Sequence, residues 1–134
     1  MRYFIVIFFL SAILFAEELH WYDDYKEAKS MAKQTHKLIY VFISSAHCGW
    51  CHKFENTTLQ DKDVQKELDQ DFIAVHLIRD FDTIPKKFQV SPVPRHYFTD
   101  AKGNILYDTL GYREVDSFKA YMGYAKDQIQ NKEK

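Results

Sequence analysis

The sequence predicts an α/β protein with a four-stranded mixed sheet and helices on both faces. Two continuous apolar runs, residues 37–44 and 72–78, are typical of strands buried on both faces. Two shorter strand-like runs, 95–99 and 104–110, flank a turn that ends in glycine, which indicates a hairpin. Strands joined through helices run parallel and a hairpin adds antiparallel strands, so the sheet should be mixed.

The first half of the domain is predicted as helix, strand and helix. Apolar residues recur at helical spacing through residues 21–37, and Asp23 or Asp24 can cap the start of this helix. The buried strand at 37–44 follows directly. A second helix begins at or just before Cys48.

In the second half, a helix at 62–70 leads into the strand at 72–78. Residues 83–90 are predicted as a short helix opened by Thr83, since a proline is tolerated in a first turn. The hairpin comes next, and a helix at 114–130 closes the domain. This last helix places on one face Val115, Phe118, Tyr121, Met122 and Ala125.

The composition fits one folded domain without a charge excess. The chain has 134 residues with 18 Lys and Arg against 19 Asp and Glu, a formal net charge of -1. This balance gives no basic field for nucleic acid, so no nucleic-acid partner is expected. Aromatic residues make up 16% of the chain and only 4 glycines occur, which excludes a disordered or fibrous class.

The first 16 residues differ from the rest of the chain. Arg2 precedes an apolar run that ends at Phe15, and Ala16 offers a small residue for cleavage. This order matches a secretory signal peptide, and the run is shorter than the roughly 20 apolar residues of a spanning helix. We therefore predict a signal peptide at 1–16 and a mature domain at 17–134. An uncleaved anchor is the alternative.

The only two cysteines form a C-x-x-C pair at the start of the second predicted helix. A dithiol catalyst needs one thiolate that attacks at neutral pH and a second thiol that resolves the mixed disulfide. In the first helical turn, free N–H groups and the macrodipole favour the thiolate of Cys48. We predict Cys48 as the attacking thiol and a more buried Cys51 as the resolving thiol. Protonated His47 or His52 would favour the thiolate further.

Two other residues near the pair are candidates for the same chemistry. Glu55, four residues after Cys51, is the nearest carboxylate on the predicted helix and could take the proton of the resolving thiol. Trp50, between the cysteines, could shield the disulfide and contact substrate. The plain alternatives are an ion-paired or solvated Glu55, solvated histidines, and a Trp50 ring packed on a loop.

A buried strand that leads into C-x-x-C at a helix start resembles the thioredoxin superfamily. The stretch "FQVSPVPRHYFTDAKGNIL" adds a proline, a strand, a turn and a strand in the order of that family. The resemblance covers about residues 24–126 and implies the thioredoxin fold. It also implies that Pro94 is a cis proline beside the cysteines and that the Val93–Pro94 backbone binds an extended substrate segment. Pro92 is the competing position, at a less fitting distance from the strand.

The stretch "CGWCHKFE" is similar to the active site of the periplasmic disulfide isomerases, and residues 21–44 are similar to small thioredoxin-related periplasmic proteins. This resemblance implies a periplasmic thiol–disulfide oxidoreductase of a Gram-negative bacterium, acting on protein disulfides as reductase or isomerase. A membrane redox partner would recycle the dithiol, no cofactor is needed, and a monomer is expected. A disulfide-donating oxidant is the alternative.

The same residues also match C-x-x-C-H, the attachment motif of c-type haem. A haem protein would need a distal ligand such as Met31 or Met122, and four predicted strands do not suit a small, mostly helical cytochrome. A metal site built on Cys48, Cys51 and His52 lacks a second ligand pair at metal-like spacing. A binding module that does not use its cysteines is disfavoured because both are present.

Overall fold

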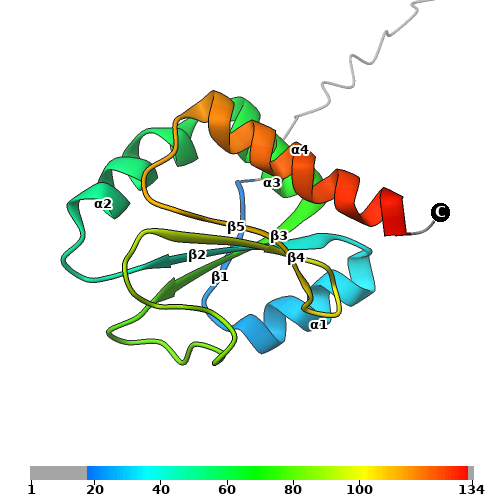
Figure 1. Ribbon diagram of the computed structural model, residues 1–134, viewed down its shortest axis with the longest axis horizontal. Coiled ribbons are helices and arrows are strands. Elements are labelled where there is room, and N and C mark those ends of the chain that lie inside the picture. Colours follow the sequence, from blue (N-terminus) through cyan, green and yellow to red (C-terminus); the bar gives the residue numbers. More distant parts are fainter. Residues whose placement is uncertain (1–17, 133–134) are drawn as a thin grey trace, which may run out of the picture.

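The computed structural model of the protein describes residues 18–132, which form one five-stranded sheet with helices on both faces (Figure 1). The strands are β1 (Trp21–Tyr22), β2 (Leu38–Ser44), β3 (Phe72–Ile78), β4 (Arg95–Thr99) and β5 (Ile105–Leu110). The helices are α1 (Tyr25–Thr35), α2 (Gly49–Asn56), α3 (Lys62–Asp71) and α4 (Val115–Lys132), with a short 3₁₀ turn at Thr58–Gln60. The predicted signal peptide, residues 1–16, lies outside the described residues.

The strand order is β1-β3-β2-β4-β5. β1 and β2 both pair with β3 in parallel, whereas β4 is antiparallel to β2 and β5 is antiparallel to β4. The predicted mixed sheet and thioredoxin fold are therefore confirmed, with one strand more than expected.

The additional strand, β1, comes from residues that were predicted to begin the first helix. That helix starts only at Tyr25, because the Asp24 carboxylate accepts hydrogen bonds from the N–H groups two and three residues further on. The residues before this cap are extended, and Trp21 and Tyr22 pair with β3 at the sheet edge. The local periodicity could not distinguish a longer helix from an edge strand.

The predicted short helix at 83–90 is wrong. One turn is present, in which the Phe88 N–H donates to the Pro85 carbonyl at 3.0 Å, and the remainder is loop. The Phe88 ring is buried in the core, and the neighbouring Lys87 ammonium donates to the Gly103 carbonyl at 2.5 Å. These contacts with distant segments outweigh a local helix preference that is weak next to proline.

The sheet separates two apolar cores. Figure 1 shows α1 on one face of the sheet and α2, α3 and α4 on the other. Along β2, Ile39, Val41 and Ile43 face α1, while Tyr40 and Phe42 face the layer of α2, α3 and α4. Both faces of the sheet are thus covered, as the unbroken apolar run predicted. Within residues 18–132, no helix combines the length and apolar character needed to cross a bilayer.

Candidate active site

The two cysteines lie at the start of α2, directly beyond the carboxyl end of β2. Cys48 is the N-cap residue, and a disulfide joins it to Cys51 with a Cα–Cα distance of 5.2 Å. The backbone N–H of Cys51 donates to Cys48 Sγ at 3.2 Å. When the pair is reduced, this N–H and the helix macrodipole favour negative charge on Cys48.

The two thiols differ in their access to solvent. Cys51 is fully buried and belongs to the core that also contains Phe42 and Phe54. Cys48 is half-buried at the edge of the same core. Cys48 is therefore the more solvent-accessible of the two sulfurs.

An apolar groove lies beside the disulfide, and we call it the proline groove. Its volume is about 440 Å³, and it is lined by Trp50, Pro92, Val93, Pro94, Leu110, Gly111 and Tyr112. The three residues expected to contact substrate, Trp50, Val93 and Pro94, thus lie together. The Ser91–Pro92 and Val93–Pro94 peptide bonds are both cis.

Trp50 forms the exposed rim of the proline groove. It is 60% exposed, and its ring centroid lies 5.9 Å from that of Tyr112. The Lys53 ammonium lies 5.0 Å from the Trp50 ring centroid and 4.7 Å from that of Tyr112. Trp50 thus packs on Tyr112 and Lys53 and remains largely exposed at the rim of the groove.

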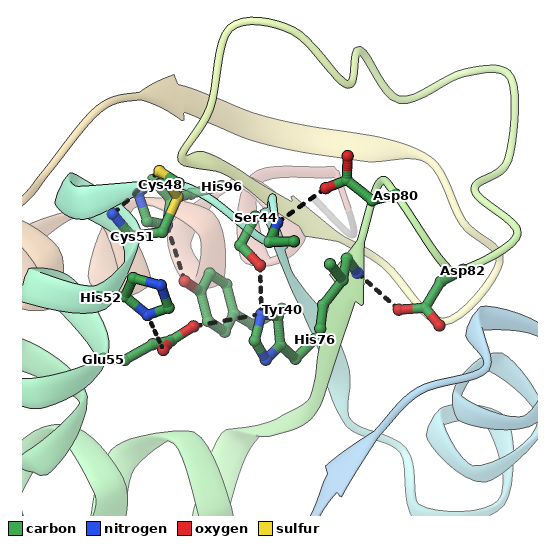
Figure 2. Close-up of polar contacts among 12 residues, drawn as sticks. Tyr40, Ser44, Cys48, Cys51, His52, Glu55, His76, Asp80, Asp82 and His96 are labelled. Atoms are coloured by element: carbon green, nitrogen blue, oxygen red, sulfur yellow. Dashed lines mark hydrogen bonds and ion pairs between the residues drawn. A yellow bond between two sulfur atoms is a disulfide. The ribbon is translucent and has the colours of Figure 1, made fainter.

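The other three sequence candidates occupy different places. His47 is exposed on the turn before Cys48, while His52 and Glu55 lie close together on α2. His52 Nδ1 is 3.4 Å from Glu55 Oε2. A second imidazole, that of His76 on β3, approaches the other carboxylate oxygen at 3.5 Å (Figure 2).

His76 was not a sequence candidate. Its Nε2 lies 2.7 Å from Ser44 Oγ, and its ring stacks on Phe42 at a centroid distance of 4.6 Å. Burial lowers the pKa of His76 below its ordinary value, and the carboxylates of Glu55 and Asp82 oppose that shift. The alternation of β3 could have placed His76 on the α2 face, but only the strand register puts it opposite Phe42.

A third histidine, His96 on β4, is fully buried beneath the proline groove. Its Nδ1 lies 2.8 Å from the Tyr40 hydroxyl and its Nε2 lies 2.9 Å from the Gly111 carbonyl. Because a carbonyl only accepts, Nε2–H donates to Gly111 and Nδ1 accepts from Tyr40 in the neutral ring. Gly111 N–H in turn donates to the Pro94 carbonyl at 2.8 Å, so His96 supports the groove.

His96 should make stability pH-dependent. Burial lowers the pKa of His96 from 6.5 to about 4, so the unfolded chain takes up the proton first as the pH falls. The stabilisation is fully present above pH 6.5 and is lost progressively towards pH 4. This corresponds to a loss of about 3 kcal/mol in the free energy of unfolding, measurable by urea titration.

Two variants test this assignment to His96. His96→Gln keeps a donor and an acceptor but does not titrate, so its stability should vary much less between pH 7 and pH 4. His36→Asn changes an exposed histidine at the end of α1 and should keep the wild-type pH dependence. A wild-type slope in His96→Gln would assign the effect to other groups.

A metal centre or a haem would need more than the two cysteines. Among residues 18–132, no group of three or more His, Cys, Asp or Glu side chains is placed to hold a metal ion. Attachment of a c-type haem requires access to both thiols, and the burial of Cys51 does not provide it. Met122, one of the two methionines considered as a distal ligand, is fully buried in the core.

Comparisons with known proteins agree with the fold. The sequence model of a thioredoxin-like domain family matches residues 25–126. Spermatogenesis-associated protein 20 of Homo sapiens is 30% identical over 60 residues, which cover 45% of this chain and 8% of that protein. The matched stretch thus spans less than a tenth of the length of this relative.

Two solved structures have the same fold. A thioredoxin from Thermus thermophilus superimposes with a TM-score of 0.68 at 23% identity, covering 79% of this chain and 85% of that one. A structure described as DsbH oxidoreductase gives a TM-score of 0.62 at 23% identity, covering 84% and 85%. With its Cys48–Cys51 pair at the start of α2, the chain belongs to the thioredoxin-like domain family.

Proposed function

We propose that the protein reduces or isomerises disulfides of exported proteins in the periplasm of a Gram-negative bacterium. The observation that carries this proposal is the asymmetry of the pair at α2, with a reachable Cys48 and a buried Cys51. The adjoining proline groove, lined by Trp50, Val93 and Pro94 among others, offers an apolar surface to an extended substrate segment.

The proposed reaction uses each cysteine once. The Cys48 thiolate attacks a substrate disulfide, forms a mixed disulfide and releases the first substrate thiolate. Cys51 then attacks Cys48 Sγ and releases the second substrate thiolate. Trp50 and the backbone at Val93–Pro94 hold the substrate chain next to Cys48 during both steps.

The periplasmic location is supported by the signal-like residues 1–16 and by the resemblance of "CGWCHK" to periplasmic disulfide isomerases. In this proposal residues 17–134 are the mature protein, and a membrane redox partner returns the disulfide to the dithiol. The likeness to the DsbH structure, that of an oxidoreductase, is consistent with this class of activity. We propose that the mature protein acts as a monomer without a cofactor.

The reduction potential of the Cys48–Cys51 pair tests the direction of the reaction. Titration of the mature protein against glutathione should give a value between about -270 mV, typical of thioredoxin, and about -180 mV, typical of disulfide isomerases. A value near roughly -120 mV would instead mark a disulfide-donating oxidant. The absorption spectrum of the same sample provides a control, since a Soret band would indicate attached haem.

A further inference from the structure

We infer that Glu55, held in place by His76, is the base that takes the proton of Cys51 during resolution of the mixed disulfide. This inference deepens the proposed function and rests on the roles proposed there for the two cysteines. It assigns a positioning role to His76 on β3, a residue outside the cysteine motif.

Resolution requires a base close to Cys51. The Cys51 side chain is fully buried, so bulk water cannot take its proton directly. Glu55 lies one turn further along α2 on the same helix face, where Cβ atoms four residues apart are separated by roughly 5–6 Å. The Glu55 side chain is about one third exposed, so it has the access to solvent that Cys51 lacks.

Glu55 is held from two sides. Its carboxylate lies between the imidazoles of His52 and His76, at 3.4 Å and 3.5 Å (Figure 2). His76 is itself fixed by Ser44 Oγ at 2.7 Å and by stacking on Phe42. Because His76 belongs to β3, its contact fixes the position of the Glu55 carboxylate. A fully solvated glutamate would have no such restraint.

Other ionisable groups near the pair are engaged elsewhere. Both nitrogens of His96 are already hydrogen-bonded, one to Tyr40 and one to Gly111. Asp80 accepts the Ala46 N–H at 2.8 Å, beyond the end of β2. His52 has a side chain that is 58% exposed and turned towards Glu55.

A cavity provides a way out for the proton. It has a volume of about 270 Å³, and its lining includes Glu55, His76, Trp21, Leu59 and Gln65. Because Glu55 and His76 both line this cavity, water that enters it can contact the carboxylate and the imidazole. A proton taken up by Glu55 can thus pass to solvent without crossing the core.

Atoms and electrons balance in the proposed step. In the mixed disulfide, the Cys51 thiol gives its proton to the Glu55 carboxylate, and the Cys51 thiolate attacks Cys48 Sγ. The Cys48–Cys51 bond forms, the bond between Cys48 and the substrate sulfur breaks, and the electron pair leaves with the substrate thiolate. Over both steps the dithiol loses two electrons and the substrate disulfide gains them. Glu55 then releases its proton to water.

A chromogenic aryl disulfide, dithiobis(nitrobenzoate), separates the two steps in the reduced full-length mature protein. The first nitrothiobenzoate is released when Cys48 attacks, at a rate that depends on reagent concentration. The second is released when Cys51 resolves the adduct, at a rate independent of reagent concentration. The first phase tests the proposed function, and the second tests the role of Glu55.

Glu55→Gln should slow the second phase by about 100-fold and leave the first phase within about twofold, as expected for loss of a general base. Glu55→Asp, which keeps a carboxylate, should recover part of the second-phase rate. Asp127→Asn removes an exposed carboxylate on α4 and should leave both phases unchanged.

His76 has its own signature in the pH profile. The wild-type second phase should slow at acid pH, below the ordinary titration range of an imidazole, because burial lowers the pKa of His76. Once protonated, His76 stabilises the Glu55 carboxylate and makes it a weaker base. The charged groups that act on His76 are the carboxylates of Glu55 and Asp82, and its direct contacts Ser44, Phe42 and Trp21 are uncharged. The carboxylates of Glu18, Asp23 and Glu27 line the two cavities next to His76. His76→Gln should remove this acid limb.

Two outcomes would overturn the inference. One is a second phase in Glu55→Gln as fast as in the wild type. The other is equal slowing of both phases, which would indicate a general defect in α2. A wild-type protein whose first phase is missing would contradict the proposed function itself, a result that is distinct from either of these.

Discussion

Cys48→Ser should lower the rate of disulfide exchange by at least about 1,000-fold, because a serine hydroxyl is a far weaker nucleophile than a thiolate. Cys48 is the thiol that solvent and substrate can reach, and the Cys51 N–H already points at its sulfur. The buried Cys51 cannot take over the attack. The first phase of the aryl disulfide reaction measures this loss directly.

Replacement of the second cysteine, Cys51→Ser, should leave the attack intact and block only its resolution. Cys48 still attacks, but no thiol resolves the adduct, so mixed disulfides with substrate proteins accumulate. They should appear as additional bands on non-reducing gels of cell extracts and disappear on reduction. The double variant with both cysteines replaced is the control and should trap nothing. Trapping by Cys48→Ser instead would reverse the assignment of the two thiols.

Much of this fold follows from local sequence patterns. β2 and β3 are continuous apolar runs because both of their faces are covered, and the C-x-x-C motif marks the start of α2. The errors occur where distant contacts decide. β1 forms because Trp21 and Tyr22 pair with the edge of β3. The loop around Phe88 takes its conformation from the packing of the Phe88 ring against Tyr97 in the core.

The residues of the candidate site also fall into those predictable from local sequence and those that depend on distant contacts. Glu55 was found from its spacing to Cys51 along one helix, which is a local relation. His76 and His96 could not be identified from local spacing. Each lies on a strand next to β2, and only the strand register places both beside Phe42. Alternation along a strand can indicate the face of the sheet on which a histidine lies, but its neighbours on the adjoining strands are set only by the register.

The largest effect on stability is expected at Phe118 of α4, which is fully buried where α2, α4 and the sheet meet. Its ring centroid lies 5.1 Å from Tyr40, 5.3 Å from Phe54, 5.9 Å from Phe98 and 6.0 Å from His96. Phe118→Ala should lower the free energy of unfolding by about 3–5 kcal/mol, since it opens a cavity among rings that cannot collapse into it. Urea unfolding measures this.

Two further variants make the test decisive. Phe81→Ala removes a ring that is 75% exposed and should change stability by no more than about 0.5 kcal/mol. Phe118→Leu refills part of the volume and should fall between Phe118→Ala and the wild type, so a value remains measurable if the alanine variant does not fold. A Phe118→Ala protein within about 1 kcal/mol of wild type would contradict the central role of this ring.

The variants of Phe118 also show whether stability and the reactivity of Cys48 are independent of one another. It supports α2 through Phe54, but the contacts that favour the Cys48 thiolate are local to the first turn of that helix. Folded Phe118→Leu should therefore attack the aryl disulfide at nearly the wild-type rate despite its lower stability. A slower first phase in the fully folded variant would mean that core packing, and not the helix start alone, sets the reactivity of Cys48.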